Sequence, residues 1–175
     1  MDALGLYRAA CWLGAHRVPA LPGLLETAGR LLFRGGLSRE ATLAQGCGVG
    51  YGGQGVCVAP GVRVGPFSFL AQDVTLGARP GERGVPTLGA YVYVGAGAQV
   101  LGAVHVGDFA IIGANAVVEQ DVPRGAIVAG VPARVLRCVE DPEAAFTRDT
   151  GMRVDPALLG VCDEPREERP HAARG

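Results

Sequence analysis

The sequence predicts an all-β fold: a parallel β-helix of six-residue repeats with a short helical segment at its N-terminal end. Three observations predict it. Aliphatic residues recur every six positions, small residues stand two positions before most of them, and 28 glycines are spread through 175 residues that are also rich in aliphatics. A fixed repeat of this kind determines the fold class more strongly than the propensity of any single segment.

The six-residue period keeps one phase along the middle of the chain. The aliphatic positions are Val58, Val64, Leu70, Leu76, Leu88, Val94, Val100, Val106, Ile112 and Val118, with Glu82 in the interrupted slot. The residues two positions earlier are Val56, Val62, Ser68, Val74, Val92, Ala98, Val104, Ala110 and Ala116. This period fits neither a 3.6-residue helix nor a long amphipathic strand, because the glycines would break both.

A triangular coil satisfies the period. If each repeat forms one short strand and one turn, three repeats make a coil of about 18 residues, and coils stack at about 4.8 Å. The predicted interior columns are Val58, Leu76, Val94 and Ile112 on one side and Leu70, Leu88 and Val106 on another. Corners that need unusual backbone angles are expected at Gly65, Gly77, Gly89, Gly95, Gly107 and Gly113. A glycine-rich β-sandwich is the disfavoured alternative, because sandwich strands do not keep a fixed phase.

The segments around the repeat complete the predicted organisation. Residues 1–36 read as a helical segment, with helices over 4–13 and 21–32 that cap the open strand edges of the first coil. Residues 37–137 form the β-helix. Within it, residues 77–87 are rich in proline and glycine and predict a protruding loop, which is a common place for function. Residues 138–175 are charged and predict a mobile, polar tail.

Composition excludes several classes of partner. The net charge of −1 gives no field that would attract nucleic acid or an anionic membrane. No apolar run reaches the roughly 20 residues of a membrane helix. The five cysteines lack metal-ligand spacing, so we expect no metal and a reducing, cytoplasmic compartment.

Four stretches of the repeat region carry a resemblance to a known family. Residues 89–102 (GAYVYVGAGAQVLG), 112–118 (IGANAVV), 121–123 (DVP) and 129–135 (AGVPARV) resemble bacterial serine acetyltransferases. They are less similar to galactoside, maltose and antibiotic acetyltransferases of the same hexapeptide-repeat superfamily. The resemblance runs from about Phe33 to Arg137 and includes the linker at residues 16–19.

The resemblance implies a left-handed β-helix, a homotrimer, and acetyl-CoA bound in a groove between neighbouring β-helices. It also implies a small hydroxyl acceptor, such as serine, near the protruding loop. Carried over by position, the residues along the CoA would be Ala96, Gln99, Ala114, Gly130, Arg134 and Arg137. The two arginines would bind the CoA phosphates, since guanidinium groups bind phosphate bidentately and keep their charge.

On the acceptor side, Arg83 matches the family arginine that binds the acceptor's carboxylate. Tyr51 and Gln72 are the further candidates for contacts with the acceptor. Gln99 stands where relatives often carry lysine or threonine.

The general base is the open question. A serine hydroxyl needs a base within hydrogen-bond reach, most often histidine. Tyr51 and Gly52 stand where the resembled enzymes have an Asp-His pair, Ala59-Pro60 replaces a His-Pro of a related subgroup, and residues 83–86 (RGVP) lack the loop histidine. His105, outward beside Val106, and Asp73, near the loop, are the candidates that the sequence offers.

The leading hypothesis is therefore an acetyl-CoA-dependent O-acetyltransferase acting on serine or a similar small hydroxyl compound. One alternative is a catalytically impaired trimer that acts as a binding or assembly protein. Another is a diverged acyltransferase of specialised metabolism. A γ-class carbonic anhydrase is excluded, because that class needs three histidine ligands and two of the three histidines, His16 and His171, lie outside the repeat.

Overall fold

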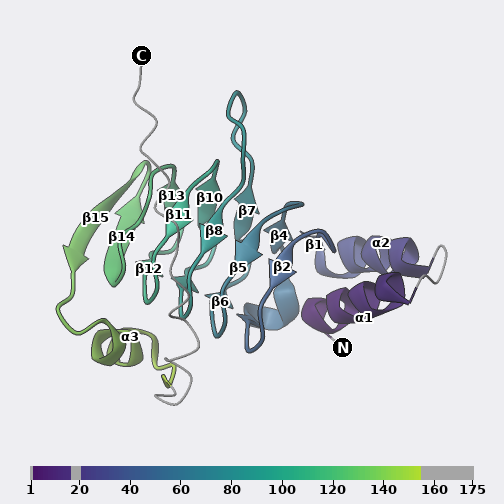
Figure 1. Cartoon of the computed structure of the whole chain (residues 1–175), viewed down its shortest axis with the longest axis horizontal. Coiled ribbons are helices and arrows are strands. Elements are labelled where there is room, and N and C mark those ends of the chain that lie inside the picture. Colours follow the sequence, from purple (N-terminus) through teal and green to yellow (C-terminus); the bar gives the residue numbers. More distant parts are fainter. Residues whose placement is uncertain (1, 17–20, 155–175) are drawn as a thin grey trace.

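A computed structural model describes residues 2–16 and 21–154 of the chain. It confirms the predicted left-handed parallel β-helix, whose short strands stack along one axis (Figure 1). Most of the predicted linker at residues 16–19, the whole stretch after residue 154, His171 and Cys162 lie outside the described residues.

The described strands fall into three sheets, one for each side of the prism. Sheet A contains β1 (Gly36–Leu37), β4 (Cys57–Val58), β7 (Thr75–Gly77), β10 (Gln99–Leu101) and β13 (Val117–Val118). Sheet B contains β2 (Thr42–Leu43), β5 (Arg63–Val64), β8 (Thr87–Leu88) and β11 (His105–Val106). Sheet C contains β3 (Gly48–Val49), β6 (Phe69–Leu70), β9 (Tyr93–Val94), β12 (Ile111–Ile112), β14 (Ala126–Gly130) and β15 (Ala133–Cys138). Pairing is parallel except between β14 and β15, which form an antiparallel hairpin.

The aliphatic positions of the repeat line the interior, as predicted, and are almost fully buried. The predicted columns are wrong in part, because Leu76 pairs with Val100 rather than with Val94. The inserted loop lengthens that coil, so the partner of Leu76 is one repeat further along the chain. Val94 instead stacks on Leu70 in sheet C, while Leu88 and Val106 pair as expected in sheet B.

The predicted role of the corner glycines is also wrong. None of the six, all within the described residues, has a positive φ. The left-handed corner positions are held by Phe67, Asp73, Tyr91, Phe109 and Asn115 and by other glycines, among them Gly61 and Gly97. Glycine is needed for close stacking instead, because a Cβ on Gly95 would lie 2.6 Å from the backbone nitrogen of Ala114 in the next coil.

The N-terminal helices lie at one end of the β-helix (Figure 1). Helix α1 (Ala3–Ala15) begins where Asp2 accepts a hydrogen bond from the Gly5 amide at 2.8 Å, and α2 (Leu21–Phe33) packs against it. The Tyr7 hydroxyl donates to the Ala41 carbonyl at 2.7 Å, which fixes α1 to the first coil. No helix within residues 2–16 or 21–154 is long and apolar enough to cross a membrane.

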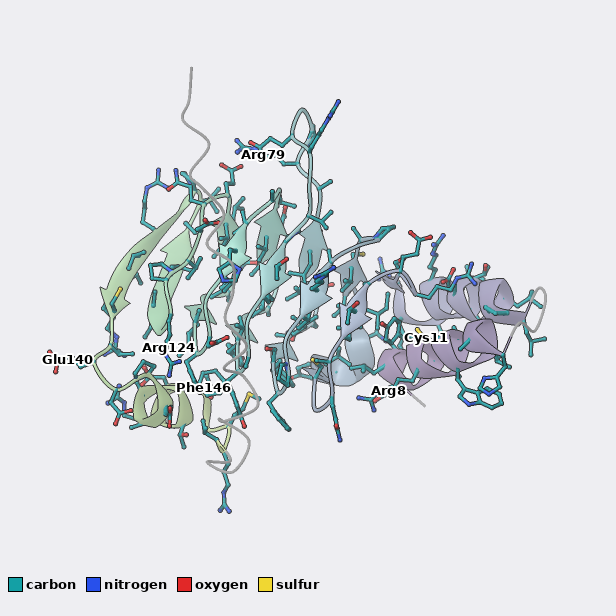
Figure 2. The ribbon with its side chains drawn as sticks, viewed as in Figure 1. Arg8, Cys11, Arg79, Arg124, Glu140 and Phe146 are labelled. Atoms are coloured by element: carbon teal, nitrogen blue, oxygen red, sulfur yellow. The ribbon has the colours of Figure 1, made fainter. Side chains whose placement is uncertain are left out.

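Helix α3 (Pro142–Thr150) packs against the corner of the β-helix that carries Phe67, Tyr91 and Phe109. Phe67, Tyr91 and Phe109 stack there with ring centroids 5.2 Å apart, and Phe146 of α3 meets Tyr91 and Phe109 edge-on. Phe146 is fully buried, and Figure 2 shows it beside Arg124, whose guanidinium lies over the Phe109 ring. The expectation of a mobile tail is therefore wrong for residues 142–150, because one buried aromatic residue docks an otherwise polar helix.

Candidate functional site

The outer face of sheet A is bordered by two corners of the prism. The C–A corner contains the turns that lead from sheet C to sheet A: residues 50–56, 71–74, 95–98 and 113–116. The A–B corner contains the turns that lead on to sheet B, among them the long loop after β7. Between them, Cys57, Thr75 and Gln99 occupy adjacent outward positions of paired strands.

The C–A corner brings three predicted site residues into one row. The Gly97 amide donates to the Gln72 carbonyl at 2.9 Å, and the Asn115 amide donates to the Ala96 carbonyl at 2.8 Å. Gln72, Ala96 and Ala114 therefore occupy equivalent turns of successive coils. The short side chains of Ala96 and Ala114 leave the backbone of this corner accessible to an extended ligand.

Tyr51 lies at the same corner, one coil before Gln72, in the 3-10 turn η1 (Gly50–Gly53). Its φ of 47° and ψ of 40° are left-handed, and its side chain is 81% exposed. A bulky residue in this conformation costs about 1–3 kcal/mol, and in this fold the same conformation recurs at the corner residues Phe67 and Tyr91. The flanking Gly52 and Gly53 also have positive φ, so the Gly-Tyr-Gly-Gly sequence builds a turn that presents the phenol to solvent.

Asp73 follows Gln72 and is exposed at the turn before β7. Its φ is 59°, and its amide donates to the Gln54 carbonyl at 2.9 Å. The carboxylate packs against Gly55, where any Cβ would collide with it. Glycine at position 55 therefore makes room for a carboxylate beside the C–A corner.

The loop between β7 and β8 projects from the A–B corner, as predicted, and Figure 2 shows Arg79 on it. Arg83 is exposed, and among the described residues it makes no ion pair or hydrogen bond that would occupy its guanidinium. The acceptor candidates thus stand on both sides of sheet A, with Tyr51 and Gln72 at one corner and Arg83 at the other.

His105 lies beyond that loop, on sheet B. It occupies the outward row with Thr87 and Arg63, and its backbone amide donates to the Asp121 carboxylate at 2.7 Å. The predicted position above Leu88 is correct, whereas Leu70 belongs to sheet C. Within one chain, the two candidate bases His105 and Asp73 therefore lie on different sides of the prism.

The last cofactor candidates belong to the β14–β15 hairpin. Gly130 has a φ of 99° and pairs with Ala133 near the C–A corner. Arg134 is exposed and donates to the Ala133 carbonyl at 2.9 Å. Arg137 forms an ion pair with Asp149 of α3 at 2.6 Å. The hydrogen bond from Arg148, with a further contribution from Arg137, holds the pKa of Asp149 below its usual value.

Three residues bordering the site were not singled out by the sequence. Thr75 points outward beside Gln99. The alternation of inward and outward side chains along a strand could have predicted this position. Asn115 is exposed at the C–A corner next to Ala114 with a φ of 56°. Asp149 reaches Arg137 only because α3 docks, and no local pattern in the sequence indicates that contact.

Comparisons with known proteins agree with this geometry. The family described as "Bacterial transferase hexapeptide (six repeats)" matches residues 86–120. A serine acetyltransferase of Synechococcus elongatus is 38% identical over 157 residues, which cover 89% of this chain and 59% of that protein. A serine acetyltransferase of Helicobacter pylori is 36% identical over 138 residues, which cover 78% of this chain and 80% of that protein.

Solved structures give the same result. A serine acetyltransferase in complex with cysteine has a TM-score of 0.72 at 29% identity, covering 87% of this chain and 59% of its own. The serine acetyltransferase of Brucella abortus in complex with coenzyme A has a TM-score of 0.71 at 30% identity, covering 78% of this chain and 56% of its own.

The β-helix of six-residue repeats places the chain in the superfamily of the bacterial hexapeptide transferases. Within that superfamily, the chain belongs to the serine acetyltransferase family. It spans 59% of the Synechococcus relative and 80% of the Helicobacter relative.

Proposed function

We propose that the protein transfers the acetyl group of acetyl-CoA to the hydroxyl oxygen of serine or a similar small acceptor. The observation that carries the proposal is the row of Gln72, Ala96 and Ala114 on the C–A corner, with Arg83 across sheet A. Relatives that share this part of the chain are named serine acetyltransferases, and one such enzyme was solved with coenzyme A.

The cofactor would lie along the C–A corner. Ala96, Ala114 and Gly130 are small enough to let the pantetheine arm approach the backbone, and Gln99 offers an amide from the adjacent strand. Arg134 is available for a phosphate. Arg137 already pairs with Asp149 through one terminal nitrogen, so a phosphate there competes with the carboxylate for this donor.

The acceptor would lie across the outer face of sheet A. Arg83 holds the carboxylate of serine with two parallel hydrogen bonds, and Tyr51 and Gln72 contact its polar groups. Asp73 takes the hydroxyl proton while the oxygen attacks the thioester carbonyl carbon. The carbon–sulfur bond then breaks, and the CoA thiolate leaves and takes up the proton that Asp73 had accepted, which restores the carboxylate. His105 is the alternative base, and it fits this role only if a neighbouring subunit brings it to the groove.

Assembly as a homotrimer would complete the groove. The candidate residues lie on an open outer face and two exposed corners, so a second β-helix is needed to exclude water from the reaction. We further propose that the enzyme works in the reducing cytoplasm, which suits the exposed thiols of Cys57 and Cys138. Absence of a bound metal, of a nucleic-acid partner and of a membrane partner stay predictions.

A second candidate function is a non-catalytic binding or assembly protein. It is favoured by one specific observation: Gly52 stands where the resembled enzymes carry the histidine of an Asp-His pair, and Ala59 stands where a related subgroup carries histidine. The remaining candidate is a diverged acyltransferase of specialised metabolism, which would use the same groove for another hydroxyl acceptor.

The test is an assay of thiol release from acetyl-CoA with serine, threonine and homoserine, with alanine as the control that lacks a hydroxyl. Serine-dependent release that alanine does not support is expected. Calorimetric binding of CoA without turnover on any acceptor would favour the binding protein. Neither binding nor turnover would reject both functions.

A further inference from the structure

The protruding loop begins with a tight turn that is closed by a backbone hydrogen bond and by an ion pair between side chains. The backbone amide of Glu82 donates to the Arg79 carbonyl at 3.1 Å, and Pro80 and Gly81 occupy the two central positions. Gly81 has a φ of 84°, as a type II turn requires at its third residue. The side chains of Arg79 and Glu82 also pair across the turn at 3.1 Å.

The same turn is held against later coils of the β-helix. Arg79 uses its other terminal nitrogen to reach Glu119, in the turn that follows β13, at 3.4 Å. The Glu82 carboxylate rests on Gly102, where a Cβ would lie only 2.7 Å from it. The loop therefore projects from the A–B corner but is tied to the later coils through Arg79 and Glu82.

The anchoring continues on the far side of Arg83. A Cβ on Gly84 would lie 2.7 Å from the Cβ of Ala103, so the backbone there touches the β10–β11 turn. Arg83 stands between these two anchored points, and its own side chain is exposed and without a partner among the described residues. Its backbone position is thus determined by neighbours on both sides.

The energetics indicate what these ion pairs do. The side chains of Arg79, Glu82 and Glu119 are 37%, 48% and 30% exposed, and such pairs contribute at most about 1 kcal/mol each. That is too little to determine the stability of a β-helix with a continuous aliphatic core. It is enough to change the population of one ordered loop conformation severalfold.

We propose that Arg79 and Glu119 form a clasp that positions Arg83 to receive the carboxylate of the acceptor. Both are positioning residues, because they act through Arg83 and do not touch the acceptor. This inference rests on the proposed function. Pre-ordering Arg83 reduces the conformational entropy that is lost when the acceptor binds, so the clasp lowers the KM for acceptors that carry a carboxylate.

The kinetic test compares Glu119→Gln with wild-type enzyme on serine and on serinamide, which lacks the carboxylate. The KM for serine rises by about two- to fivefold, the range set by one exposed ion pair, while kcat stays within about twofold. The KM values for serinamide and for acetyl-CoA do not change. Glu26→Gln is the matched control, because it removes the Arg39–Glu26 pair of 3.1 Å, which joins helix α2 to Arg39 away from the loop.

Trypsin provides a readout that is independent of activity. The bond after Arg83 is cleavable, whereas the bond after Arg79 is protected because Pro80 follows it. Loss of the clasp raises the rate of cleavage after Arg83 in Glu119→Gln and leaves it unchanged in Glu26→Gln. If wild type shows no acetyl transfer, the proposed function fails, yet the protease rates still decide whether the clasp orders the loop. Equal cleavage rates, or an equal rise in KM for serinamide, overturn the inference.

Discussion

Arg137 of β15 donates a hydrogen bond to Asp149 of α3 at 2.6 Å, although the two residues belong to different elements of the structure. The arginine expected to bind a CoA phosphate is therefore already paired with a carboxylate, which it shares with Arg148. Asp149 keeps its charge well into the acidic range, because Arg148 and Arg137 hold its pKa below the usual value. Any phosphate that binds at Arg137 competes with this internal ligand.

Asp149→Asn is expected to tighten acetyl-CoA binding. Removing the carboxylate frees Arg137, and the KM for acetyl-CoA should fall by about two- to fivefold at low ionic strength, as for one exposed ion pair. The gain should shrink as salt is added, because exposed charges are screened. Glu143→Gln is the control: it breaks the ion pair of the same helix with Arg124 at 3.6 Å, which is not a phosphate candidate. An equal fall in both variants would assign the effect to α3 as a whole.

The general base can be identified by comparing Asp73→Asn with His105→Gln. If Asp73 accepts the hydroxyl proton, its replacement lowers kcat by about 10²- to 10⁴-fold while the protein remains folded and binds CoA. Replacement of His105, on sheet B, then leaves kcat nearly unchanged. The opposite result would place His105 in the groove and would require a neighbouring subunit to bring it there. Initial rates give kcat for both variants, and calorimetry shows whether each still binds CoA, so that the two measurements together identify the base.

The sequence was sufficient to predict the interior of the β-helix, whereas the roles of the residues at the C–A corner stay predictions. Val94 and Ile112 were predicted as core from their phase alone, and Ala96 and Ala114 from resemblance, because both signals are local. The partner of Leu76 was predicted wrongly, since a loop of unknown path lengthens the coil that it interrupts. The docking of α3 was not foreseen for a similar reason: its main apolar contact is Phe146, which meets aromatic residues far away in the sequence.

Tyr7 makes the stability of the protein sensitive to alkaline pH. Burial, together with the neighbouring Cys11, raises the pKa of Tyr7 from 10.0 to about 12. Below pH 10 the phenol is protonated in both folded and unfolded chains, so its contribution is complete. Between pH 10 and 12 the unfolded chain loses the proton first, and the free energy of unfolding falls. The chain contains no lysine, so few other side chains titrate in this window.

Tyr7→Phe is the corresponding variant. It loses the hydrogen bond to the Ala41 carbonyl, which lowers the free energy of unfolding at neutral pH by about 1 kcal/mol. It also flattens the alkaline decline, as urea denaturation at several pH values would show. A parallel decline in wild type and variant would mean that Tyr7 ionises normally. Burial also raises the pKa of Cys47, which is present in both proteins.

Gly95→Ala tests whether the glycines of the repeat serve close stacking rather than unusual backbone angles. The new methyl group would lie 2.6 Å from the Ala114 nitrogen and 2.8 Å from the Ile112 carbonyl oxygen. Both are backbone atoms of the next coil and cannot move aside without breaking the ladder, so we expect destabilisation by about 1–3 kcal/mol or more.

Gly23→Ala is the matched control, because a Cβ there meets nothing within 4 Å and the residue lies in helix α2. That substitution should stabilise the helix by about 0.5–1 kcal/mol. Denaturation midpoints of the two variants, measured side by side, show whether Gly95 is needed for close stacking. If Gly95→Ala were tolerated as well as Gly23→Ala, the coils would have room between them, and the six-residue period would need another physical cause.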